Sequence, residues 1–155
     1  MTVLIGIDLG DRRIGIAWGD SSSGSIAPVT TLRRSTPEHD AESIERIRSD
    51  RHATGIVVGL PLHMDGSESE QSARTRDWAD AVAPGLDAPL TFRDERLTSE
   101  GARARMGRPP RGRSGGPPSP SALRQWRARI DREAAAQILQ AEFDARRLTM
   151  GESNA

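Results

Sequence analysis

With 155 residues and a 35% share of hydrophobic residues, the chain is long enough for one domain with its own core. It contains no cysteine, which excludes disulfides, thiolate metal sites and cysteine nucleophiles. It also lacks the pattern of a signal peptide and any apolar stretch of membrane-spanning length, so we expect a cytoplasmic protein.

The charges balance overall but are unevenly distributed along the chain. There are 22 basic and 22 acidic residues, yet residues 96–132 contain ten arginines and only two acids, a net charge of +8. The rest of the chain therefore carries a net charge of −8. A basic segment of this kind favours a polyanionic partner such as nucleic acid. A solvated run of charges without a partner stays open as the alternative.

The N-terminal part of the chain predicts three short strands. Residues 3–9 and 14–19 alternate between large apolar and small or polar residues, which is the period of a strand with two different faces. Gly10 and Asp11 supply a tight turn between them, so these two strands must be antiparallel. Residues 26–32 predict a third strand, which makes the first three strands a meander.

Helices and strands alternate after residue 35. Thr36 and Pro37 begin a predicted helix that ends near residue 51. The uninterrupted apolar run at 54–60 predicts a central parallel strand buried on both faces. The remaining predicted elements are a helix from the capping-box pair Ser67 and Glu70 to about Ala83, a strand at 89–95, a short helix from Thr98 to about Met106 and a last helix from about Leu123 to Leu148.

The segment between the last two helices has an unusual composition. Residues 107–122 contain five prolines and four glycines, so we expect a long mobile loop inside the domain. We predict a single domain at 1–150 with a short tail at 151–155. The order of the elements predicts an α/β fold, with a mixed five-stranded sheet and helices on both faces.

Acidic residues stand at positions that the predicted fold would bring together. Asp8 lies near the carboxyl end of the first strand and Glu95 at the end of the last one, where sites form in open α/β sheets. Asp131 lies on the inward stripe of the last helix, where an unpaired carboxylate is costly. Together these three acids predict an all-oxygen site for Mg²⁺ or Mn²⁺. Two alternatives stay open, a structural Asp8 and an Asp131 paired with a neighbouring arginine, Arg127 or Arg132.

The first two strands also carry a row of small residues. We expect this bare face to let a phosphodiester backbone approach the sheet closely. Close packing of a helix over the same face is the alternative, and the two are compatible on different parts of it. The residues concerned are Gly6, Gly10, Gly15, Ala17 and Gly19.

Four segments resemble, in order and spacing, the YqgF family, also called RuvX. They are "GIDLGDRRIGIAWGD", "GIVVGLPLHMDGS", "FRDERLTSE" and "RIDREAAAQILQ", and they span residue 3 to about 145. The resemblance implies an RNase H-like fold. It also implies that Asp8, Glu95 and Asp131 are the catalytic acids, that Arg13 contacts phosphate, and that Arg96 orients Glu95 or binds substrate.

The same resemblance implies a metal-dependent endonuclease of the two-metal type that processes the 5′ end of pre-16S rRNA together with ribosomal particles. Resolution of four-way DNA junctions is the alternative reaction, and a non-catalytic nucleic-acid-binding protein is a further one. A two-lobed ATPase needs a second lobe that 155 residues do not supply. A monomer and a homodimer both stay open, and we interpret His63 as a rim histidine. The predicted substrate-binding residues are Arg13, Arg96, Arg103, Arg105, Arg108, Arg111 and Arg113.

Overall fold

The computed structural model describes residues 2–95 and 107–153. Five strands form one mixed sheet in the order β3-β2-β1-β4-β5. β1, β2 and β3 are the antiparallel meander predicted from the sequence, and β4 and β5 run parallel to β1. The strands are β1 (Val3–Leu9), β2 (Arg13–Asp20), β3 (Ser25–Arg33), β4 (Gly55–Leu60) and β5 (Leu90–Asp94).

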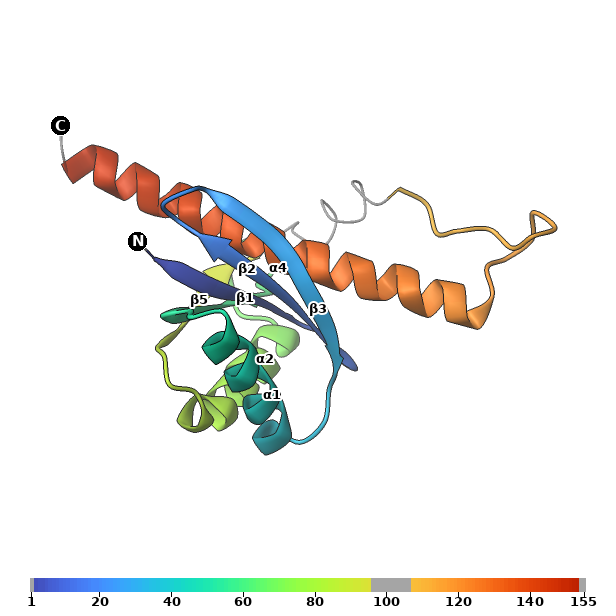
Figure 1. The fold of residues 1–155 in the computed structure, drawn as a ribbon, viewed down its shortest axis with the longest axis horizontal. Helices are drawn as coiled ribbons and strands as arrows, with labels where there is room; N and C mark the ends of the chain where they lie inside the picture. The colour runs from blue at the N-terminus through green and yellow to red at the C-terminus, as the bar shows by residue number, and fades with distance from the viewer. Residues whose placement is uncertain (1, 96–106, 154–155) are drawn as a thin grey trace.

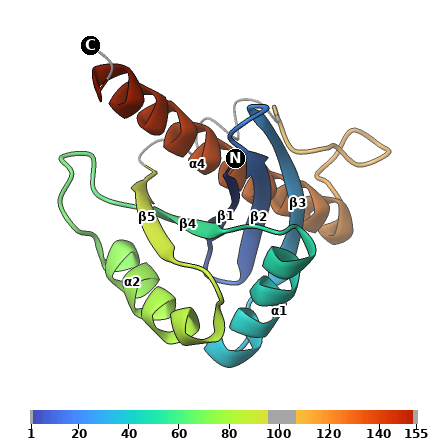
Figure 2. The same cartoon turned by 60° about the vertical axis from the view of Figure 1, so that its left-hand side comes forward.

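Helices cover both faces of this sheet (Figures 1 and 2). α1 (Pro37–Asp50) and α2 (Glu70–Val82) pack on one face, and the short 3-10 turn η1 (Ala83–Gly85) follows α2. α4 (Pro120–Ser153) crosses the opposite face. The predicted α/β class, with a mixed five-stranded sheet between helices, is therefore confirmed.

The alternation along β1 assigns its side chains to two separate cores. Ile5 and Ile7 join the core beneath α1 and α2, while Leu4 joins the core beneath α4. Every residue of the central parallel strand β4 is buried, as its apolar run predicts. β1, β4 and β5 are parallel, so their carboxyl ends lie at one edge of the sheet, and this edge carries Asp8, Leu60 and Asp94.

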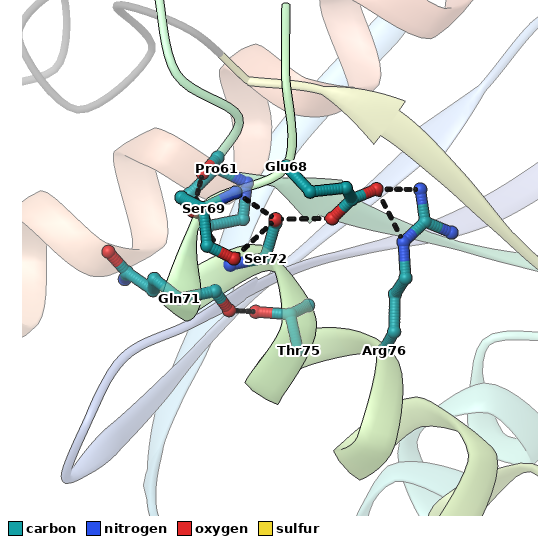
Figure 3. A network of polar contacts seen from close by, with 7 residues as sticks. All are labelled: Pro61, Glu68, Ser69, Gln71, Ser72, Thr75 and Arg76. Carbon is teal, nitrogen blue, oxygen red and sulfur yellow. Dashed lines mark hydrogen bonds and ion pairs between the residues drawn. The ribbon is translucent and has the colours of Figure 1, made fainter.

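α2 begins later than the sequence predicts. Its N-cap is Ser69, whose hydroxyl accepts the backbone N–H of Ser72, while the Ser72 hydroxyl accepts the N–H of Ser69 (Figure 3). The predicted cap, Ser67, is held instead in a turn by Asp65, whose carboxylate accepts both its N–H and its hydroxyl. The sequence offers several serines in this loop, and the local turn decides which of them caps the helix.

α4 is longer than the sequence predicts at both ends. It begins at Pro120, because the side chain of Ser119 accepts the N–H of Ala122 and proline suits the first helical turn. The predicted loop therefore ends at 119, and the predicted tail begins as helix, up to Ser153. The short helix predicted from Thr98 to about Met106 lies outside the described residues. Among the described helices, none is both long and apolar enough to cross a membrane.

α4 covers most of the small-residue face. A Cβ added at Gly6 would lie 2.8 Å from the carbonyl oxygen of Ala135, and one added at Gly19 would lie 2.9 Å from the Phe143 ring. These two glycines serve the close packing of a helix, so the prediction that a phosphodiester backbone approaches the sheet is wrong at these positions. At Gly10 an added Cβ would meet only backbone atoms of Arg13, so the prediction stays open there.

Candidate active site

Two of the three predicted acids meet at the carboxyl edge of the parallel strands. Asp8 lies near the end of β1, and Glu95 directly follows β5, where its N–H donates to the carbonyl of Leu60 at 3.1 Å. Their side chains are hydrogen-bonded to each other. The residues are only 9% and 8% exposed, so the two carboxyl groups face each other away from water.

This pair has strongly altered proton affinities. Burial raises the pKa of Glu95 to about 9, and the charge of Asp8 and the hydrogen bond to it add to the effect. Burial also raises the pKa of Asp8 to about 6, although the hydrogen bond from Glu95 favours its charged form. The two groups titrate as a unit, and near neutral pH Glu95 keeps a proton that it donates to the Asp8 carboxylate.

One oxygen of the pair has no partner. Glu95 Oε2 is buried without a hydrogen bond, which costs free energy unless another group satisfies it. Space for this oxygen depends on Gly59 in β4, because a Cβ at that position would lie 2.6 Å from it. A buried, unpartnered carboxyl oxygen beside a second carboxylate is a donor set that fits a hard divalent cation.

Asp131 lies beside the pair but has a partner of its own. Arg13, at the start of β2, donates from Nε to Asp131 Oδ2 at 2.6 Å. The charge of Asp131 helps to raise the pKa of Asp8, so the three acids share one neighbourhood. The alternative that Asp131 pairs with Arg127 or Arg132 of its own helix is therefore wrong. The partner is Arg13 of β2.

The three acids are not arranged as a ready set of ligands. Within the described residues, no group of three Asp, Glu, His or Cys side chains is placed to hold a metal ion. Asp8 and Glu95 are brought together, and Asp131 is turned to Arg13. A common ion held by all three acids therefore stays a prediction.

The predicted arginine contacts divide into two groups. Arg96, Arg103 and Arg105 lie outside the described residues. The predicted contacts Arg108, Arg111 and Arg113 are exposed, and residues 107–130 contain six arginines without any Asp or Glu. None of these six takes part in an ion pair of the described chain, whereas several arginines elsewhere pair with nearby acids. The six are Arg108, Arg111, Arg113, Arg124, Arg127 and Arg129.

The comparisons with known proteins decide the family. The profile described as "RuvX: Holliday junction resolvase" matches residues 2–145. The chain belongs to the RuvX family. Two RuvX relatives, from Chloroflexus aggregans and Acaryochloris marina, are each named "Putative pre-16S rRNA nuclease". The first is 38% identical over 93% of this chain and 94% of its own length, and the second 39% identical over 90% of each.

A solved structure supports the RNase H-like fold that the RuvX resemblance implies. The fowlpox virus resolvase, solved in complex with its substrate Holliday junction DNA, superposes with a TM-score of 0.54. It covers 93% of this chain and 98% of its own, at 7% sequence identity. At this identity the likeness concerns the fold alone.

The RuvX motifs do not reveal every residue that shapes the site. The Arg13–Asp131 pair joins residues 118 positions apart, and no local pattern predicts it. Gly59 could have been noticed as a glycine inside a strand, where close approach of another group is a usual reason for a glycine. His63 is exposed in the loop after β4, in line with its interpretation as a rim residue.

Proposed function

We propose that the chain is a metal-dependent endonuclease that hydrolyses phosphodiester bonds, with the 5′ end of pre-16S rRNA as its substrate. The observation that carries this proposal is the buried Asp8–Glu95 pair, with its unpartnered oxygen, next to Asp131 at the carboxyl edge of the sheet. Family membership supports the same reaction class, and the names of the relatives favour the precursor RNA.

Asp8, Glu95 and Asp131 would hold Mg²⁺ or Mn²⁺ in this reaction. When bound, such an ion stabilises charge on the phosphate and makes water a better nucleophile at neutral pH. The protein contributes the surroundings. Glu95 would give up its proton to hold the cation with its oxygens, and Asp8 would hold the cation as a carboxylate. The apolar side chain of Ile138 lies close to Gly59 and limits water on that side.

The six unpaired arginines of residues 107–130 would bind the phosphates that flank the scissile bond. Their side chains are exposed and no acid of that segment competes for them. The first turns of α4 and the loop before it extend beyond β3, so this surface continues away from the body of the sheet (Figure 1). Contacts of this kind give affinity that depends on salt and carries little sequence information.

Resolution of four-way DNA junctions is the second candidate function, because the family profile carries that description. The two reactions differ in substrate and share the acids. Purified protein is therefore given, in parallel, a precursor RNA with its 5′ extension and a synthetic four-way junction, each with Mg²⁺ or Mn²⁺. We expect a single cut in the RNA. Symmetric cuts in the junction alone would favour the second function instead.

The catalytic assignment is tested by Glu95→Gln, which keeps the shape of the side chain and removes its charge. We expect cleavage to fall by at least about 10²-fold, the order typical of groups that act on the reacting atoms, while RNA binding is kept. Glu42→Gln, at an exposed position of α1, is the matched control and should cleave like the natural protein. Equal cleavage by both variants would refute the assignment. Binding of RNA without cleavage by the natural protein would support the non-catalytic alternative.

A further inference from the structure

We propose that Arg13 is a positioning residue that couples nucleic-acid binding to cation binding. In the free protein it holds the Asp131 carboxylate; when a backbone phosphate arrives, its guanidinium turns to the phosphate and releases Asp131 toward Asp8 and Glu95. We call this contact the Arg13–Asp131 latch. The inference rests on the proposed nuclease function, and it adds a mechanism by which substrate completes the cation site.

The first observation is the geometry of the latch. Arg13 uses only Nε for Asp131, at 2.6 Å, and its two terminal amino groups make no hydrogen bond within the described chain. The Arg13 side chain is 33% exposed, against 18% for Asp131. The terminal amino groups of the guanidinium therefore remain free to donate and are accessible from solvent. Phosphate oxygens are acceptors that match the planar arrangement of these donors.

The second observation is that the backbone around Asp131 is fixed. A Cβ added at Gly15 of β2 would lie 2.0 Å from the carbonyl oxygen of Asp131, so α4 already touches the sheet there. One helical turn earlier, the Thr31 hydroxyl of β3 donates to the carbonyl of Ala128 at 2.6 Å. Release of Asp131 is therefore a rotation of its side chain and requires no movement of α4.

The third observation is the balance of charge in the free site. Three carboxyl groups in one neighbourhood repel each other when all are ionised. In the free protein the guanidinium of Arg13 offsets part of this repulsion through its contact with Asp131. A divalent cation can take the place of this guanidinium once Arg13 has another anion to bind.

The latch predicts positive coupling between the two ligands. A phosphate that engages Arg13 makes a third carboxylate available and so tightens cation binding, and the cation tightens phosphate binding by the same factor. It also explains why the described residues hold no ready group of three ligands. We expect a coupling factor of at least about five, the lower end of the usual range.

The experiment measures Mn²⁺ affinity by calorimetry, with and without a phosphorothioate-linked oligoribonucleotide that is checked on a gel for integrity. The natural protein should bind Mn²⁺ at least about five-fold more tightly when the oligonucleotide is present. Arg13→Gln should bind Mn²⁺ more tightly than the natural protein in the absence of oligonucleotide, and should show no coupling. Arg13→Lys, which keeps the charge, should regain part of the coupling.

Arg12→Gln is the matched control, because Arg12 is the exposed neighbour of Arg13 and forms no ion pair within the described residues; its coupling factor should stay unchanged. Thermal unfolding checks that each variant is folded. If Arg13→Gln keeps the natural Mn²⁺ affinity and the natural coupling, the latch is refuted while the nuclease site stands. If the natural protein binds no Mn²⁺ in either state, both the latch and the metal-dependent function are refuted.

Discussion

At the scale of single residues, the site is built from groups that are costly on their own. Glu95 is buried with one oxygen lacking a partner, and Asp8 is buried against it. The unpartnered oxygen of Glu95 is unusual for a residue that only stabilises the fold, because buried polar atoms normally have a hydrogen-bond partner. The free-energy cost of burying these two carboxyl groups fits a site in which the substrate or the cation supplies the missing partner of Glu95 Oε2.

The absence of a side chain at Gly59 gives a prediction that a substitution can test. In Gly59→Ala the new methyl group would lie 2.4 Å from Ile138 Cδ1 and 2.6 Å from Glu95 Oε2, so both side chains must move. We expect a loss of about 1–3 kcal/mol in the free energy of unfolding and at least about ten-fold slower cleavage. Urea denaturation and a cleavage assay measure the two effects. Gly116→Ala is the control, since its Cβ would meet nothing closer than 3.8 Å.

The pKa of Glu95 gives a prediction about pH. The pKa is raised from 4.5 to about 9, so the folded protein binds a proton that the unfolded chain releases across this interval. The stability of the metal-free protein should therefore fall as the pH rises from about 5 to 9. Thermal unfolding in a chelator measures this, and Glu95→Gln should flatten the dependence. We expect the unfolding temperature of the natural protein to fall by at least about 2–4 °C.

An unchanged unfolding temperature across that pH range would mean that Glu95 is not buried in its protonated form. Addition of Mn²⁺ at pH 8 should raise the unfolding temperature of the natural protein more than that of Glu95→Gln, because the cation replaces the proton. The pH series and the Mn²⁺ addition thus examine the same carboxyl group by independent means.

At the scale of elements, short-range patterns predicted the strands and α1 well. The alternation in β1 and β2 and the cap at Thr36 depend on neighbouring residues, and each is found where expected. The cap of α2 and the start of α4 were misplaced, because Asp65 and Ser119 decide them through turns that the sequence does not distinguish. The Arg13–Asp131 pair was missed because only the packed sheet and α4 bring its members together.

The start of α2 can be tested directly. Ser69→Ala removes the hydroxyl that accepts the Ser72 N–H at 2.9 Å and donates to the carbonyl of Pro61 at 2.6 Å. We expect the free energy of unfolding to fall by about 1 kcal/mol, the usual value of such a cap. Ser67→Ala, at the exposed position that the sequence favoured, should cost less. Urea denaturation compares the two, and a larger loss from Ser67→Ala would contradict the cap described here.

At the scale of the whole molecule, charge separates two regions. In the body of the domain and in the second half of α4, several arginines pair with acids, as Arg48 does with Glu45 and Arg93 with Glu142. In residues 107–130 no acid is present, and the six arginines remain exposed. A protein that is neutral overall can therefore still present a strongly basic surface next to its acidic site.

This separation predicts how salt affects RNA binding. Replacing Arg124, Arg127 and Arg129 together by glutamine should weaken binding and reduce the slope of log affinity against log salt by about 2–3, because each phosphate contact contributes about 0.7–0.9. Replacing Arg46, Arg51 and Arg74 instead removes the same charge from the α1 and α2 side of the sheet. If both triple variants lowered the slope equally, net charge alone would explain binding. Because the proposed RNA contacts lie at the start of α4 and not on α1 or α2, we expect the control to keep nearly the natural slope.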